Sequence, residues 1–259
     1  MRTMFKLLSV LSLSLFITSF TYKAKSKVIV FVGAHPDDES AISDVLAMHA
    51  RLGHKVHVII ATDGKDGTRV TKIPAGDSLG NVRKQESICA CKTLGIEPPI
   101  FLSVERLDTR IGVGNYFKAL KQLLVSLKEK INNLKPDVII TFGPDGDTHH
   151  AEHIVIGGAV TELLLMEGWA EKYPLYYVSW TKKQGETFDL GYVHEKYFNV
   201  RINYTQADED KALESMKCYV TQFTPDELKE DHAKKIKDTD NTLHFRRFMW
   251  KSGLKNGFK

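Results

Sequence analysis

The sequence predicts an α/β fold in which one parallel sheet carries helices on both faces. Three observations lead to this prediction. Short β-branched runs recur along the chain, amphipathic segments separate them, and the 259 residues are 42% hydrophobic and 26% charged. Such a composition is ordinary for a chain that buries a sizeable core. Because the sequence has no internal repeat and no linker-like stretch, we expect a single domain.

The strands and helices alternate from residue 27 onward. Lys27–Ala34 (KVIVFVGA) is the apolar run of a strand buried on both faces, and helical spacing follows until Gly53. Further strands are expected at 55–62, 99–103 and 137–143, and further helices at 81–94, 115–134 and 152–166. This order predicts a Rossmann-like parallel sheet. Beyond it, we expect strands at 175–180 and 197–202 and helices at 207–220 and 225–237.

The charge of the chain is nearly balanced, with 36 basic and 32 acidic residues and a formal net charge of +4. Nucleic-acid binding usually needs a concentrated basic face, so we expect no nucleic-acid partner. The C-terminal segment 244–259 does mix basic and aromatic residues, as some nucleic-acid and membrane-surface segments do. We expect its aromatic side chains to pack against the domain.

The three cysteines are too few for the disulfide framework of a small secreted scaffold. Cys89 and Cys91 stand two positions apart in a helical pattern, so their side chains point to different sides. We expect all three, including Cys218, to be small apolar core residues.

The N-terminus has the pattern of an export signal. Arg2 and Lys6 precede an apolar stretch from Leu7 to Phe20, which is short for a membrane span. We expect residues 1–22 to be a signal peptide or, alternatively, an uncleaved N-terminal anchor, and residues 25–259 to be the folded domain. The protein is then secreted or periplasmic, and it contacts a membrane only if the segment stays attached.

Chemically active residues cluster after two of the expected strands. The first strand leads into His35-Pro36-Asp37-Asp38-Glu39, and the strand at 137–143 leads into a loop ending His149-His150-Ala151-Glu152-His153. Loops at the carboxyl ends of parallel strands share one edge of the sheet. We therefore expect the two clusters to face each other.

Imidazole and carboxylate groups are the ligands that Zn²⁺ takes in proteins. His35, Asp38 and His153 supply two nitrogens and one oxygen and leave a position for water. Asp37 is then free to act as a general base, and His150 to stabilise an oxyanion or protonate a leaving amine. Two alternatives stay open: Asp38 or Glu39 caps the following helix, or His149 pairs with His153 one helical turn away.

These motifs resemble the LmbE-like, or PIG-L, deacetylases. The matching residues are the complete Ala34-His-Pro-Asp-Asp-Glu39 motif, the His150-Ala-Glu-His153 motif, the Arg83–Gly95 helix and the segment from Lys211 to Gln222. The resemblance implies a zinc-dependent hydrolase that removes acetyl groups from N-acetylglucosamine-type sugars and their conjugates.

The resemblance also implies roles for individual residues. His35, Asp38 and His153 become the metal ligands, Asp37 the general base and His150 the oxyanion-stabilising group. Arg83 and Asp108 match positions that contact the substrate. For Arg83 a structural pair with Glu86 is an equal alternative, and for Asp108 a plain loop carboxylate is favoured.

The chain departs from the family pattern in its second motif, which is commonly His-Pro-Asp-His. Thr148 also stands where some members carry a tyrosine. Three functions remain in competition: a zinc N-deacetylase acting on an acetylated amino sugar or glycoconjugate, a non-haem iron enzyme built on the same ligands, and a metal- or carbohydrate-binding protein without catalysis. The bound metal is expected to be Zn²⁺, with Fe²⁺ as the alternative.

Overall fold

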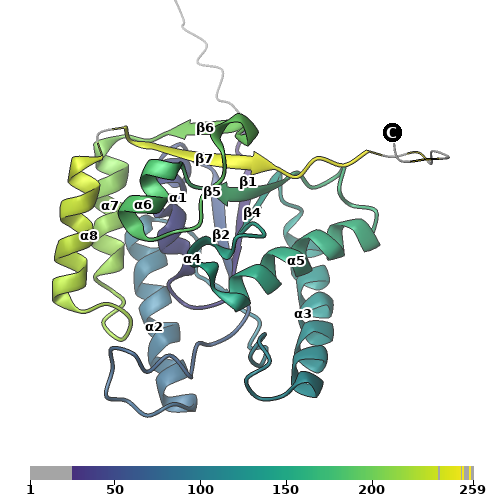
Figure 1. The fold of residues 1–259 in the computed structure, drawn as a ribbon, viewed down its shortest axis with the longest axis horizontal. Helices are drawn as coiled ribbons and strands as arrows, with labels where there is room; N and C mark the ends of the chain where they lie inside the picture. The colour runs from purple at the N-terminus through teal and green to yellow at the C-terminus, as the bar shows by residue number, and fades with distance from the viewer. Residues whose placement is uncertain (1–24, 239, 252, 254–256, 258–259) are drawn as a thin grey trace, which may run out of the picture.

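A computed structural model describes residues 25–238, 240–251, 253 and 257, and its fold is shown in Figure 1. Seven strands form one sheet in the order β3-β2-β1-β4-β5-β7-β6. The strands are β1 (Val28–Gly33), β2 (Lys55–Ile60), β3 (Ile100–Phe101), β4 (Val138–Thr141), β5 (Leu175–Ser179), β6 (Val200–Asn203) and β7 (Thr242–Arg247). Strands β1 to β5 pair in parallel, which confirms the predicted α/β sheet.

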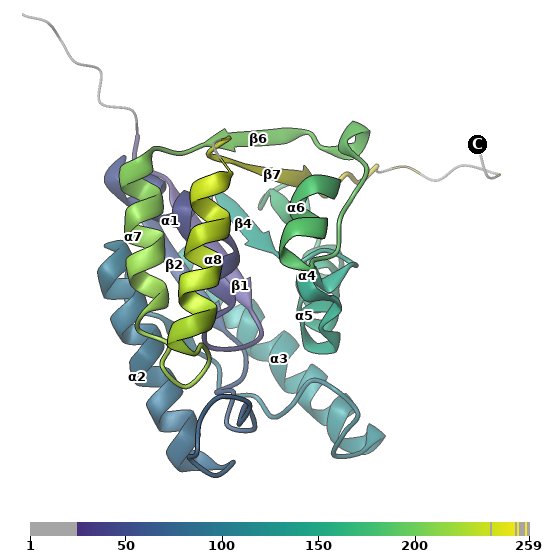
Figure 2. The same ribbon diagram turned by 60° about the vertical axis from the view of Figure 1, so that its left-hand side comes forward.

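Helices cover both faces of the sheet, as the sequence predicts. The long helices are α1 (Ser43–Arg51), α2 (Asp77–Leu94), α3 (Val113–Leu134), α5 (Ala151–Met166), α7 (Gln206–Met216) and α8 (Pro225–Lys237). The short ones are η1 (Asp38–Ile42), α4 (Gly146–His149), α6 (Lys182–Phe188) and η2 (Glu195–Tyr197). α1, α2 and α7 pack together on one side, and α3 packs on α5 on the other (Figures 1 and 2). Within the described residues, no helix combines the length and apolarity needed to cross a membrane.

The centre of the sheet is β1, whose apolar residues 29–32 are almost fully buried. It pairs with β2 on one side and with β4 on the other. The chain builds outward from β1 through β2 to β3, and then returns to place β4 on the opposite edge of β1. Ligands of open α/β sheets bind at the carboxyl ends of the strands where the order reverses. The loops after β1 and β4 occupy that place.

The last strand corrects the prediction of a purely parallel sheet. β7 runs antiparallel to both β5 and β6. Its apolar residues Leu243 and Phe245 are buried, and Arg246 lies 5.5 Å from the ring centre of Tyr177. The period-two alternation of apolar and polar side chains explains the strand, because only one face of β7 enters the core. The expected packing of tail aromatics against the domain holds for Phe245.

The cysteines are not all small core residues, contrary to expectation. Cys89 of α2 and Cys218, two residues after α7, form a disulfide across 129 positions of the sequence. Cys91 is buried and unpaired among the described residues, as expected. The pairing was missed because it depends on α2 packing against α7, which local spacing does not reveal. The expected signal segment at 1–22 lies outside the described residues.

Removing the disulfide is expected to destabilise the fold without abolishing it. A bridge that closes so long a loop restricts the unfolded chain, and its loss typically costs about 2–5 kcal/mol. We expect the Cys89→Ser/Cys218→Ser variant to lose that much free energy of unfolding in urea titrations. Reduced wild-type protein serves as the control and is expected to match the double variant. Equal stability of oxidised and reduced protein would contradict the prediction.

Candidate active site

The loops after β1 and β4 bring three histidines together. His35 follows β1, while His150 and His153 lie at the start of α5. One ring nitrogen from each lies within 4.8 Å of the others. His149 is exposed and is not part of this group. The two sequence motifs therefore meet at the edge of the sheet, as expected.

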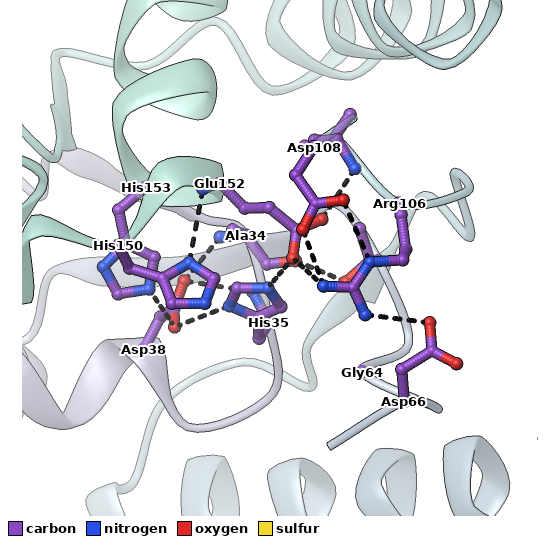
Figure 3. Close-up of polar contacts among 12 residues, drawn as sticks. Ala34, His35, Asp38, Gly64, Asp66, Arg106, Asp108, His150, Glu152 and His153 are labelled. Atoms are coloured by element: carbon purple, nitrogen blue, oxygen red, sulfur yellow. Dashed lines mark hydrogen bonds and ion pairs between the residues drawn. The ribbon is translucent and has the colours of Figure 1, made fainter. Parts of the chain in front are cut away.

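Hydrogen bonds fix which ring nitrogen of two histidines carries the proton (Figure 3). His153 Nδ1 lies 3.1 Å from Gly146 O, and because a carbonyl only accepts, Nδ1 donates and Nε2 is the nitrogen left to bind a cation when the ring is neutral. His35 Nε2 lies 2.8 Å from Glu152 Oε2, which leaves Nδ1 of His35 as the corresponding nitrogen. Both free nitrogens face Asp38 Oδ1, at 3.0 Å from His153 and 3.5 Å from His35. Two ring nitrogens and one carboxylate oxygen therefore converge on one point, where protons on the imidazoles or a metal ion would neutralise the negative charge.

The charges around this point act in the same direction. Burial lowers the pKa of His35, but Asp38 and Glu152 outweigh it and raise the pKa to about 10. Burial acts to raise the pKa of Asp38, yet the imidazoles of His153 and His35 hold it well below its usual value. The second oxygen of Asp38 accepts hydrogen bonds from the backbone of Ala34 at 2.5 Å and of His35 at 3.0 Å. A field that stabilises a proton on imidazole also stabilises a divalent ion.

His150 is held in a different way from the other two histidines. As the N-cap of α5, its Nδ1 accepts a hydrogen bond from the backbone N–H of Glu152 at 3.2 Å. Burial and the charges of His35 and His153 lower the pKa of His150 to about 4, so the ring is neutral with its proton on Nε2. Metal ligation through Nε2 would require the other tautomer and would break the cap. This favours Asp38 over His150 as the third ligand.

Asp37 lies beside this group on a strained backbone. Its φ of 104° falls in the left-handed region that non-glycine residues rarely adopt. Its side chain is partly exposed and lines the same cavity as the histidines. Burial raises the pKa of Asp37 to about 6, with the charge of Arg83 acting in the opposite direction. A carboxylate of this kind suits proton transfer near neutral pH.

Arg83 braces the turn that carries Asp37. Its guanidinium is buried and donates to Pro36 O at 2.7 Å and to Gly64 O at 2.8 Å, with Asp37 Oδ1 at 3.3 Å. The alternative pair with Glu86 is wrong, because Glu86 accepts two hydrogen bonds from Thr221 instead. Arg83 also lines the cavity, so one side chain can hold the turn and reach a ligand.

Asp108 lies next to the site but does not line its cavity. It accepts hydrogen bonds from Arg106 at 2.7 Å and from Arg110 at 2.5 Å. Arg106 continues the contact to Glu152 Oε2, at 3.5 Å. The described geometry thus matches the alternative of a loop carboxylate, which supports the metal-facing residues through Arg106.

The cavity encloses about 630 Å³ and also exposes residues that sequence reasoning missed. Glu152, which orients His35, stood only as an unassigned position within the second motif. Asp147 and Trp180 line the wall near His153 and are joined by a hydrogen bond. No local pattern signals this contact, because Trp180 follows β5, about 30 residues further along the chain.

Comparison with known proteins gives a family match across the site. Residues 30–164 match the family model of GlcNAc-PI de-N-acetylase, PIG-L. A curated relative, the 1D-myo-inositol 2-acetamido-2-deoxy-alpha-D-glucopyranoside deacetylase of Mycolicibacterium vanbaalenii, is 27% identical over 161 residues, covering 54% of this chain and 55% of the relative. The chain thus spans about half the length of the curated relatives it matches.

Solved structures with the same fold carry different activities. The N,N'-diacetylchitobiose deacetylase from Pyrococcus horikoshii aligns with a TM-score of 0.62 at 16% identity, covering 86% of this chain and 84% of that one. GalB, the 4-carboxy-2-hydroxymuconate hydratase from Pseudomonas putida KT2440, aligns with a TM-score of 0.61 at 15% identity, covering 89% and 100%. These likenesses show the fold, which does not by itself fix the chemistry.

Backbone strain at Asp37 is expected to appear as a difference between two substitutions. Asp37→Gly and Asp37→Ala both remove the carboxylate, but only glycine relaxes at a φ of 104°. Strain of this kind costs about 1–3 kcal/mol, and the extra freedom of unfolded glycine offsets up to about 1 kcal/mol. We expect the glycine variant to be more stable than the alanine variant by about 1 kcal/mol in thermal unfolding. An alanine variant at least as stable would show that the turn is not strained.

Proposed function

Because the chain belongs to the PIG-L family of GlcNAc-PI de-N-acetylases, we propose that it is a metal-dependent hydrolase that removes the acetyl group from an N-acetylated amino sugar or its conjugate. One observation carries the proposal: ring nitrogens of His35 and His153 converge on the Asp38 carboxylate, with Asp37 at the wall of the same cavity. The named activities of the mycobacterial relative and of the chitobiose deacetylase support the substrate class.

The donor set fits Zn²⁺, with Fe²⁺ as the alternative. His35, Asp38 and His153 would hold the ion, and hydrogen bonds to Glu152 and Gly146 orient the two imidazoles. When bound, such an ion supplies Lewis-acid polarisation of the acyl carbonyl and lowers the pKa of water to about 7.

The remaining side chains would move protons and stabilise charge. Asp37 would accept a proton from the attacking water and return it to the departing amine, and its pKa of about 6 suits both steps. His150 would donate its Nε2 proton to the developing oxyanion, since the cap to Glu152 keeps Nδ1 as an acceptor. Arg83 would hold Asp37 in position and contact the substrate at the cavity wall.

We expect the purified protein to release acetate from N-acetylglucosamine, N,N'-diacetylchitobiose or an N-acetylglucosaminyl-inositol. Chelation should abolish the release, and added Zn²⁺ or Fe²⁺ should restore it. Asp37→Asn should lower the rate about 10²–10⁴-fold while one metal ion per chain still binds, because only the proton acceptor is lost. Asp189→Asn is the matched control, since Asp189 is exposed at the end of α6.

The other outcomes separate the competing functions. Stoichiometric metal binding without acetate release would leave the metal centre standing and reject the substrate class, as for a hydratase or a binding protein. Absence of metal binding would reject the ligand assignment and the hydrolytic mechanism together.

We propose that the protein is exported to the periplasm or secreted, with retention on the membrane by residues 1–22 as the alternative. The Cys89–Cys218 disulfide supports this, because disulfides persist mainly in oxidising compartments. In a bacterial host, the full chain is expected outside the cytoplasm with the bridge formed. A chain lacking residues 1–22 should stay in the cytoplasm with free thiols, as measured by fractionation and thiol labelling. Equal distribution of both chains would reject the proposal.

A further inference from the structure

One carboxylate of the cavity has no part in the chemistry above. Asp147, in the short helix α4 that follows β4, is 8% exposed and lines the cavity together with His153. Its Oδ1 accepts a hydrogen bond from the indole Nε1 of Trp180 at 2.5 Å. Its Oδ2 makes no hydrogen bond within the described part of the chain, yet it is not sealed from solvent. A nearly buried residue of the cavity wall thus keeps one acceptor oxygen unused.

The position of Asp147 is fixed from several sides. Its backbone has φ 61° and ψ −88°, and its carbonyl accepts a hydrogen bond from Gly191 N at 2.6 Å. A side chain at position 191 would meet that carbonyl at 3.0 Å, so glycine permits the close approach. Trp180 directly follows β5, which pairs with β4 and keeps the indole in register with the loop. A strained and over-determined residue in a cavity wall indicates a functional position.

The lining of the cavity suits a sugar ring. Trp180, Phe142 and Phe188 line the cavity with Gln184, so apolar rings surround a few fixed polar groups. A carboxylate oxygen accepts hydroxyl hydrogen bonds strongly, because the bond is charge-assisted. Gly146, the residue before Asp147, accepts a hydrogen bond from His153 Nδ1 at 3.1 Å, which places Asp147 next to a proposed metal ligand.

We propose that Asp147, held by the indole of Trp180, accepts a hydrogen bond from a ring hydroxyl of the amino sugar and fixes the orientation of the ring beside His153. The assignment rests on the proposed function for its substrate class. It makes Asp147 a specificity-determining residue, distinct from the groups that hold metal or transfer protons.

The test compares N-acetylglucosamine with its 3-, 4- and 6-deoxy analogues, using the metal-loaded full chain. For wild-type protein, one analogue is expected to lose about 10–100-fold in kcat/KM, the cost of a hydrogen bond to a charged group. Asp147→Ala should lose a similar factor on the parent sugar and nothing further on that analogue. The loss should fall mainly on KM, because the contact forms when the ring binds.

Two milder substitutions test the assignment in case Asp147→Ala does not fold. Asp147→Asn keeps the size of the side chain and its acceptor for Trp180, but it can turn an amide donor toward the cavity, so it should also lose discrimination at the same hydroxyl. Trp180→Phe keeps an aromatic ring but removes the indole donor together with part of the side-chain volume, and it should weaken the same selectivity. Trp169→Phe is the matched control, since Trp169 packs on Tyr173 and does not line the cavity.

The outcomes are distinguishable from failure of the proposed function. If the wild type and the Asp147 variants lose activity equally with every analogue, Asp147 contacts no hydroxyl and the assignment is wrong, while acetate release still supports the deacetylase. If the wild type releases no acetate from any sugar, the proposed function fails and this assignment fails with it.

Discussion

The site depends on the parallel pairing of β1 with β4, where the order of strands in the sheet reverses. Residues that lie more than 100 positions apart meet only because both strands end at this place. The segment after β1 carries His35 and Asp38, and the start of α5, which follows β4 and α4, carries His153. The buried apolar strands set the spacing of these polar groups, so the stability of the core and the geometry of the site have one cause.

Bringing the side chains of His35, Asp38 and His153 together has an electrostatic cost, which the neighbouring residues offset. Burying the carboxylates of Asp38 and Glu152 is unfavourable unless positive charge, on a protonated imidazole or a metal ion, joins them. A second layer of contacts holds the arrangement, since Glu152 bonds to His35 and to the backbone N–H of Leu107, while Arg106 lies against Glu152. The same acidic residue therefore fixes a ring and is itself fixed by a cation from another loop.

Sequence patterns sufficed for features that depend on neighbouring residues. Apolar runs predicted the central strands, and the motif at Ala34–Glu39 predicted where chemistry would gather. β7 was missed because its alternating basic and apolar residues resemble a loosely packed tail. The Cys89–Cys218 bridge and the Asp147–Trp180 contact were missed because each joins elements whose packing only the folded sheet defines. The role of Glu152 in orienting His35 was missed for the same reason, because the two residues meet only in the folded sheet.

The disulfide joins two segments that contact the turn carrying Asp37, and this explains more than stability alone. α2 carries Arg83, which braces that turn, while Glu86 of the same helix holds Thr221. Tyr219, next to the bridged Cys218, hydrogen-bonds to Glu39 at the other end of the motif. A backbone in a costly conformation persists only where its surroundings over-determine it. The segment around residues 218–221 and α2 together form such a support, and the covalent bond fastens one to the other. The Cys89–Cys218 bridge therefore helps to hold the strained turn in place and so keeps Asp37 at the cavity wall.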